Sequence, residues 1–235
     1  MRLREKAYER FTRHLLALDI RPGQFISQRE LVALTDMPLG AIREMIPRLE
    51  ADGLIVTVPK RGLQIANVDV KLVRNAFQLR TILEKEAVAR FAERASDAEI
   101  EQLSGELERI ERKAERGITA KLLEEAQAMD WGFHDTIIDA LGNQLISSVY
   151  RVNSVKIRLI RLERVVLSTE AFMPAIHEHR AILAAVAKRE PAAAAAAMER
   201  HMVSARNRAM GIALVDAPQP AAEPRRRTRE PEPAK

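Results

Sequence analysis

The chain contains no cysteine among its 235 residues. Disulfide-stapled scaffolds and thiolate metal sites are therefore excluded, because both need cysteine side chains. Aromatic residues make up only 4% of the sequence, whereas 47% of the residues are hydrophobic and 30% are charged. Abundant alanine, leucine, arginine and glutamate with so few aromatics favour a mostly helical protein of one or two domains.

Long hydrophobic runs are also missing. The sequence contains no N-terminal apolar stretch of the signal-peptide type and no segment of about 20 apolar residues, so we expect a soluble, cytoplasmic protein. The formal net charge of +5 and the isoelectric point near 9.7 fit a polyanionic partner. Charge alone does not identify that partner, because Lys and Arg are also common on solvated helix faces.

The stretch from Arg21 to Gly62 predicts two closely spaced helices followed by a β-hairpin. Ser27 can cap the first helix, and Glu30 three residues later completes a capping box. The second helix is expected over about 39–51, with Pro38 at its first position. Two such helices with a hairpin behind them are typical of a winged helix-turn-helix, which binds DNA.

The second helix of this motif is expected to enter the major groove. Its buried stripe is predicted to consist of Ile42, Met45, Ile46 and Leu49. Two short strands follow at 54–58 and 63–66, joined by a basic wing tip. A helix over 1–19 is expected to brace the motif. The residues predicted to meet DNA lie on the two motif helices and the wing: Arg29, Leu39, Gly40, Arg43, Arg48, Lys60, Arg61 and Gly62.

Beyond the wing the sequence predicts only helices. Amphipathic periodicity and breaks at serine, glycine and proline divide it into segments at about 69–95, 97–117, 120–141, 144–167, 169–190 and 191–214. These six helices indicate one antiparallel bundle. From Asp216 onward Pro, Ala, Arg and Glu dominate without periodicity, so a disordered tail is expected. The predicted domains are 1–66, 67–215 and 216–235.

One helix of the predicted bundle carries Asp130 and His134, which are four residues apart and therefore share a helical face. His179 and His201 lie on two later helices. If the three imidazoles and the carboxylate converge, they form a nitrogen and oxygen site suited to Zn²⁺, Ni²⁺, Mn²⁺ or Fe²⁺. Spacing alone leaves the alternative open that these are ordinary core or surface residues.

Six short blocks follow one another in the N-terminal region: Arg21-Pro22-Gly23, Arg29-Glu30-Leu31, Ile42-Arg43-Glu44, Arg48-Leu49-Glu50, Gly53-Leu54 and Arg61-Gly62. Together they resemble the GntR family of bacterial transcription regulators. The chain departs from the family pattern where the recognition helix begins, because Leu39 stands where the family usually has arginine. Leucine cannot make arginine's bidentate contact to guanine, so a different operator preference is expected.

The helical half resembles the FCD ligand-binding domain of the FadR branch of this family, in its six-helix VanR-like subgroup. The blocks that carry this resemblance are Leu79-Arg80-x-x-Leu83-Glu84-x-x-Ala87, Asp130-x-x-Phe133-His134, Gly142-Asn143, Glu178-His179-Arg180 and His201. The resemblance implies that Asp130, His134, His179 and His201 bind a divalent metal. It also implies that Arg80 faces a carboxylate effector, whereas the alternative is a salt bridge from Arg80 to Glu84. His177 matches no family ligand.

The whole pattern predicts a homodimeric regulator, by expectation a repressor, whose hold on double-stranded DNA is controlled by a small carboxylate. A homodimer is expected because two winged helices related by a two-fold axis can read a palindromic operator. One alternative is a metalloenzyme that activates water at the Asp/His site, although this leaves the winged helix without a role. Another is a DNA-binding protein whose affinity no metabolite changes.

Overall fold

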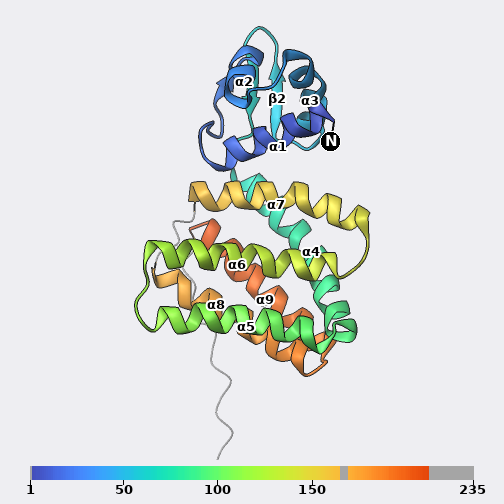
Figure 1. Cartoon of the computed structure of the whole chain (residues 1–235), viewed down its shortest axis with the longest axis vertical. Coiled ribbons are helices and arrows are strands. Elements are labelled where there is room, and N and C mark those ends of the chain that lie inside the picture. Colours follow the sequence, from blue (N-terminus) through green and yellow to red (C-terminus); the bar gives the residue numbers. More distant parts are fainter. Residues whose placement is uncertain (1, 165–168, 212–235) are drawn as a thin grey trace, which may run out of the picture.

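The structure is a computed structural model, and it describes residues 2–164 and 169–211. Within these ranges the chain forms nine helices and three short strands, arranged as two domains one above the other (Figure 1). The predicted fold class, a winged helix-turn-helix followed by a helical bundle, is confirmed. None of the helices in the described part of the chain is long and apolar enough to cross a membrane.

The N-terminal domain contains three helices and a hairpin: α1 (Leu3–Leu16), α2 (Gln28–Thr35), α3 (Leu39–Ala51), β2 (Ile55–Val58) and β3 (Gly62–Ile65). Ser27 caps α2 as predicted, since its hydroxyl accepts from the Glu30 N–H while the Glu30 carboxylate accepts from the Ser27 N–H. Pro38 is the N-cap of α3 and not its first residue. Its backbone is extended, with ψ of 148°, although its carbonyl already accepts from the Ile42 N–H.

The first helix is shorter than predicted. It ends at Leu16 because the chain turns at Leu18, whose φ of 59° is left-handed and incompatible with a continuing helix. The buried stripe of α3 contains all four predicted residues, with Ala41 in addition. Together with Phe11 of α1 and other buried side chains, this stripe forms the core of the N-terminal domain.

The sequence pattern does not predict a third strand, β1 (Phe25–Ile26), which pairs antiparallel with β3 to give the sheet order β1-β3-β2. Two residues are too few for a two-residue period to appear in the sequence. The turn before β1 contains Gly23, whose φ is +76°. A Cβ at this position would lie 2.5 Å from Oδ1 of Asn67, so the turn touches the segment that leaves the domain.

The C-terminal domain consists of six helices: α4 (Val70–Arg94), α5 (Asp97–Ala114), α6 (Ala120–Asp139), α7 (Gln144–Arg164), α8 (Thr169–Ala187) and α9 (Pro191–Ala209). Their starts agree with the predicted ones to within one residue. At the start of α4, α5 and α6, the side chain of the capping residue accepts a hydrogen bond from a backbone N–H of the first turn. The capping residues are Asp69, Ser96 and Thr119. The predicted ends at 167 and 214 and the predicted tail lie outside the described residues.

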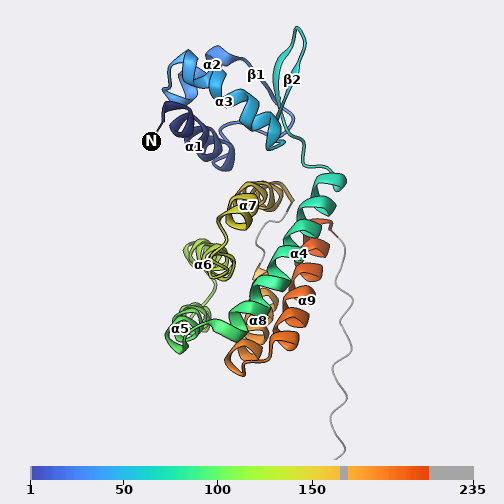
Figure 2. The same ribbon diagram turned by 90° about the vertical axis from the view of Figure 1, so that its right-hand side faces the viewer.

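The bundle has two sides. On one side α4 lies alongside α9, which packs on α8, and on the other α5, α6 and α7 form a stack (Figure 2). Side chains from both sides meet in one hydrophobic core, which includes Phe91, Leu107, Phe133, Ile182 and Met198. The interior between α4, α6, α8 and α9 is therefore enclosed by helices on all sides.

Helix α7 joins the two domains. It lies directly against α1 (Figure 1), and its Leu159 is buried within the hydrophobic core of the N-terminal domain. Other residues of the same helix, Ile157 and Ile160, pack with Val73 and Phe77 of α4. Helix α7 therefore contributes side chains to the packing of both domains.

Candidate functional site

The four residues selected as metal ligands lie together inside the bundle. Asp130 and His134 come from α6, His179 from α8 and His201 from α9, and each is at most 7% exposed. One ligand atom of each lies within 4.8 Å of the others. Nε2 of His134 is 3.4 Å from Nε2 of His179 and 3.3 Å from Nε2 of His201. His177, in contrast, is exposed.

The other ring nitrogen of each histidine, Nδ1, faces an oxygen outside the cluster. These oxygens are the Ala175 carbonyl for His179 (2.8 Å), the Glu178 carboxylate for His201 (2.7 Å) and the Glu84 carboxylate for His134 (2.6 Å). The last pair is at contact distance without hydrogen-bond geometry. Because carbonyls and carboxylates only accept, we infer that each ring carries its proton on Nδ1. The lone pairs on Nε2 then point toward one another.

Three bare imidazole nitrogens facing one another in a dry interior are unfavourable without a cation between them. Nitrogen ligands about 2.0–2.1 Å from a tetrahedral zinc ion lie roughly 3.3–3.4 Å apart. This is the spacing of the His134 nitrogen from the other two. Three imidazoles with one carboxylate suit Zn²⁺, Ni²⁺, Mn²⁺ and Fe²⁺ alike. The residues present therefore fit a divalent metal.

The protonation states of the cluster also suit a metal. Burial lowers the pKa of His134 well below its usual value, and it lowers the pKa of His179 to about 4. Burial is the largest single influence on the pKa of Asp130 and would raise it, but the charge of Arg161, with smaller contributions from His134, His179 and Arg80, together holds this pKa below its usual range. Near neutral pH the cluster thus offers neutral imidazoles at His134 and His179 and a charged carboxylate at Asp130, which are the forms that bind metals.

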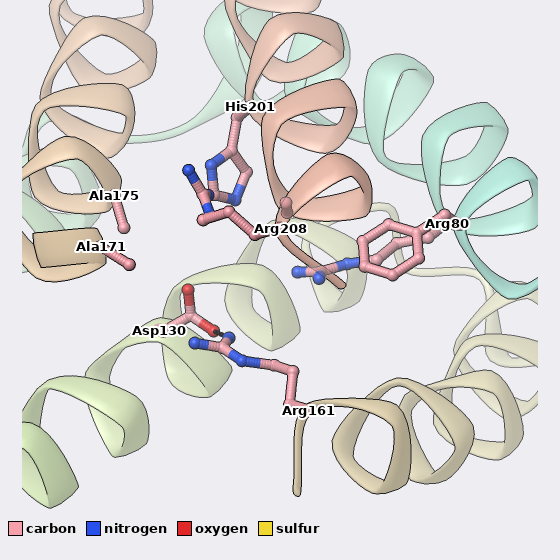
Figure 3. A pocket seen from close by; sticks show the side chains of 9 residues that line it. Arg80, Asp130, Arg161, Ala171, Ala175, His201 and Arg208 are labelled. Carbon is pink, nitrogen blue, oxygen red and sulfur yellow. Dashed lines mark hydrogen bonds and ion pairs between the residues drawn. The ribbon is translucent and has the colours of Figure 1, made fainter. Parts of the chain in front are cut away.

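A cavity of about 30 Å³ opens beside Asp130 and His201. Three arginines from three helices point into it, Arg80 from α4, Arg161 from α7 and Arg208 from α9 (Figure 3). The rest of its wall is largely apolar, formed by Phe77 and alanines of α8 and α9. A small cavity lined by guanidinium groups is suited to an anionic ligand.

Arg80 makes the salt bridge that the sequence left open as an alternative. Its Nε donates to Oε1 of Glu84 at 2.5 Å, and Tyr150 donates to the same oxygen at 3.0 Å. The pair is buried, with Arg80 3% exposed. Nη2 of Arg80 is also buried and has no hydrogen-bond partner among the described residues. One edge of the guanidinium group is therefore left for a ligand, and its role in effector binding stays a prediction.

Sequence reasoning missed the residues that hold the ligands in place. Arg161 donates to Oδ2 of Asp130 at 2.5 Å and lies over the ring of Trp131. Arg208 donates through both terminal nitrogens to Glu178, at 2.9 Å each. Neither arginine has a fixed spacing to a ligand in the sequence, so no signal could have found it. Glu178 is the sequence neighbour of the predicted ligand His179, and this adjacency could have marked it as a supporting residue.

The predicted DNA-contacting residues lie on the N-terminal domain and are exposed, except for the half-buried Gly62. Leu39, 38% exposed, stands at the start of α3 beside Gly40, and Arg43 of the same helix donates from Nε to the Gln28 side chain of α2 at 3.2 Å. Arg29 is exposed on α2. None of these side chains belongs to the described core of the N-terminal domain.

The wing tip is held by its own packing. Lys60 adopts a left-handed φ of 64° and Gly62 a φ of +99°, which together reverse the chain between β2 and β3. The guanidinium of Arg61 lies 4.0 Å from the centre of the Phe25 ring on β1. This contact orients the Arg61 side chain before any DNA is bound.

Arg48 departs from its predicted position. Its guanidinium lies 4.1 Å from the centre of the Tyr8 ring, and it lines a cleft between the domains together with Arg151 and Arg158 of α7. At about 100° per residue, position 48 is turned roughly 140° from Arg43 around the helix axis. The side chain therefore faces the bundle, away from the surface that carries Arg43.

Each of the two domains matches a known protein family. Residues 3–65 match the family of bacterial regulatory proteins described as the gntR family, and residues 75–204 match the FCD domain. The Nta operon transcriptional regulator of Aminobacter aminovorans is 28% identical over 141 residues, 60% of this chain and 65% of that protein. The transcriptional repressor GlaR of Escherichia coli K12 is 22% identical over 190 residues, 79% of this chain and 86% of that protein. The Escherichia coli K12 repressor RspR is 24% identical over 201 residues, 84% of this chain and 85% of that protein.

Solved structures share the fold. Escherichia coli McbR/YncC has a TM-score of 0.71 at 16% identity and covers 90% of this chain and 98% of its own. The metal-free FCD domain of TM0439 has a TM-score of 0.51 at 20% identity and covers 62% of this chain and 96% of its own. At such low sequence identity, these similarities support the fold assignment alone.

Proposed function

The chain belongs to the GntR family of bacterial regulatory proteins, in the subfamily with an FCD domain, and we propose that it is a repressor. It would leave its DNA when a small carboxylate binds beside a divalent metal. It is a DNA-binding transcription regulator and not an enzyme, since its curated relatives are transcription regulators. The metalloenzyme alternative is thereby wrong. Repression is proposed because GlaR and RspR are repressors.

The observation that carries the metal assignment is the set of three imidazole nitrogens that face one another beside Asp130. Asp130, His134, His179 and His201 would hold the ion. The four protein groups alone would complete a tetrahedral site, so an ion that takes five or six ligands would supply both positive charge and an open coordination position for a carboxylate. The Glu178 carboxylate fixes the ring of His201 in the orientation that presents Nε2. Because the ligands belong to α6, α8 and α9, occupation ties three helices together.

The effector proposal rests on the arginine-lined cavity. Nη2 of Arg80 is buried and unpartnered within the described residues, so a ligand oxygen there would satisfy a donor that is otherwise costly. Charge-assisted, forked hydrogen bonds between guanidinium and carboxylate are among the stronger polar contacts in proteins. A carboxylate held by Arg80 would lie beside the metal ligands that line the same cavity, Asp130 and His201.

For DNA binding we assign Leu39, Gly40 and Arg43 of α3 to the major groove. Arg29 on α2 and the wing residues Lys60, Arg61 and Gly62 are assigned to the flanking backbone. Arg48 is left out of this set because it faces the bundle. Two copies related by a two-fold axis would read the two halves of a palindromic operator, and we place this activity in the cytoplasm, where bacterial operators lie.

The proposal is tested in two steps on the full-length protein. The first is to purify it without chelator, measure its metal content, and sequence the DNA that it selects from a random pool. A palindromic consensus together with about one divalent ion per chain is expected. The second is to screen small organic acids for release of that DNA. Constant affinity with every acid would favour a DNA-binding protein that responds to no effector.

A further inference from the structure

Helix α7 connects the arginine-lined cavity with the N-terminal domain over a very short distance in sequence. Arg161 reaches into the cavity, whereas Leu159 is buried in the core of the N-terminal domain. Val155, on the same helix, also packs against that core. One helix therefore links the position of Arg161 to the packing of the N-terminal domain.

Asp130 is shared between the metal position and Arg161. Its Oδ1 faces Nε2 of His179 at 3.4 Å, and its Oδ2 accepts from Nη1 of Arg161 at 2.5 Å. The Arg161 guanidinium also lies 4.8 Å from the centre of the Trp131 ring, next to Asp130 in the sequence. Any anion that draws Arg161 away changes the contacts of both Asp130 and Trp131.

The charges in and around the cavity balance before a metal binds. The positive groups are Arg80, Arg161 and Arg208, each paired with one of the carboxylates of Glu84, Asp130 and Glu178. A divalent ion adds two positive charges to this largely buried set, since its imidazole ligands are neutral. Uncompensated buried charge is costly, so a ligand with two negative charges restores the balance.

The cavity is too small for such a ligand as it stands. A volume of about 30 Å³ holds only a few water molecules. Arg161 and Arg208 form much of its wall and are each held by a carboxylate, so a ligand makes room by replacing that carboxylate as the partner of one guanidinium. Of the two, only the Arg161 helix carries a described side chain in the N-terminal core.

Building on the function proposed above, we infer that the effector is a small dianion that draws Arg161 from Asp130, and that α7 carries the resulting shift to the DNA-binding domain. One anionic group meets Arg80 beside the metal, and the other meets Arg161 and Arg208. Arg161 is thus a positioning residue for DNA release, whereas Arg208 holds the effector and the Glu178 carboxylate, and its helix has no described side chain in the N-terminal core.

The test compares two pocket arginines on metal-loaded, full-length protein with its selected operator. Malonate and succinate are the dianionic probes and acetate is the monoanionic control. Calorimetry measures binding of each acid, and fluorescence anisotropy measures operator affinity with and without saturating acid. For the parent we expect the dianions to weaken operator binding by about 5–150-fold, the usual range of allosteric coupling.

Arg208→Gln should need more malonate or succinate but reach the same maximal release. Arg161→Gln should still bind the dianion, more weakly, yet lose most of the release at saturation. Arg161→Lys keeps the positive charge but lacks the forked guanidinium group, so it should release the operator to an intermediate extent. This variant keeps the test decisive if Arg161→Gln folds poorly. In the parent, fluorescence from Trp131, the sole tryptophan, should change with malonate and not with acetate.

Full release by Arg161→Gln at saturation, or an equal loss of maximal release in Arg208→Gln, would overturn the role of Arg161. Acetate acting as well as malonate, or neither dianion binding to the metal-loaded parent, would overturn the dianion. A parent that holds no metal or selects no DNA is a different result, because it removes the proposed function itself.

Discussion

The DNA-binding domain and the helical bundle place their functional side chains in opposite surroundings. In the first, Arg43, Lys60 and Arg61 are exposed and lie outside the core. In the bundle, the ligand side chains are buried and their outer atoms are held by partners from other turns or helices. Exposed charges interact weakly until a phosphate arrives, whereas buried ones must be satisfied within the chain.

Because of this difference, a substitution in one region affects function alone, whereas a substitution in the other also affects folding. An exposed arginine can be removed at little cost to the N-terminal domain, so its loss reports DNA binding directly. A buried ligand cannot be removed without leaving other polar groups unpaired, so its loss reports the metal and the bundle at once.

The largest effect is expected for His134→Ala. His134 supplies a nitrogen that lies within 3.4 Å of a nitrogen of each other imidazole, and its loss leaves Oε2 of Glu84 facing a buried gap. The variant should lose its metal, and Oε2 of Glu84, left buried with no donor facing it, should cost about 1–3 kcal/mol in the free energy of unfolding. Elemental analysis and thermal melting measure the two losses.

The matched control is His177→Ala, an exposed histidine on one of the ligand helices. It should keep both the metal and the melting temperature of the parent. A metal-free parent, or a His134→Ala variant with unchanged metal content, would leave the four cluster residues as ordinary bundle side chains. The contrast between a buried and an exposed functional region would then concern packing alone.

Arg43→Ala should weaken operator binding by about 1–3 kcal/mol if Arg43 reads a base. The bundle should keep its metal, because Arg43 lies on α3 in the other domain. Fluorescence anisotropy at fixed salt measures the loss. Arg48→Ala serves as the control on the same helix, and it should cost less because Arg48 faces the bundle. Equal losses in the two variants would show that the predicted face of α3 is not the one that reads DNA.

Leu39→Arg should redirect the base preference without changing stability. It restores the family's arginine at an exposed position and supplies a bidentate donor for guanine, worth about 1–3 kcal/mol of discrimination at one base pair. Sequencing the DNA selected by parent and variant measures the change, which should appear once in each half-site. Identical selected sequences would show that Leu39 does not face a base.

The smallest effect is expected for Arg61→Ala at the wing tip. If Arg61 meets a phosphate, its removal should lower the slope of log affinity against log salt concentration by about one. A salt titration of operator binding measures this slope. Arg13→Ala, a change in an exposed arginine on α1 outside the predicted DNA surface, should leave the slope unchanged. A slope that does not change in Arg61→Ala would place the wing away from the backbone.

Much of the fold could be predicted because local signals mark it. Capping side chains fix where α2, α4, α5 and α6 begin, and the apolar period gives the buried stripe of α3. Strand β1 could not be predicted, since two residues carry no period and its partner β3 lies far along the chain. Helix α3 ends at Ala51 as predicted, whereas α1, α4, α5, α6 and α8 end before their predicted ends, because periodicity fades gradually while the chain turns abruptly.

The sequence predicted the four residues of the metal cluster but not the residues that hold them in place. The spacing of Asp130 and His134 marks one helical face, and family blocks supply the two other histidines. Arg161 and Glu84 act across helices that no periodicity relates to one another, so their partners depend on the tertiary packing. The orientation of Arg48 was missed for the same reason, because the ring of Tyr8 draws it toward the bundle.

The contact between Gly23 and Asn67 determines where this chain can be divided to build hybrid regulators. Asn67 lies one residue beyond the predicted N-terminal domain, yet it fills the space next to the Gly23 turn. Asp69 belongs to the other side, because its side chain caps α4. Val68 packs against both cores and is the natural junction. A hybrid joined there should melt at a higher temperature than one joined before Asn67, and equal melting would show that this contact does not matter for recombination.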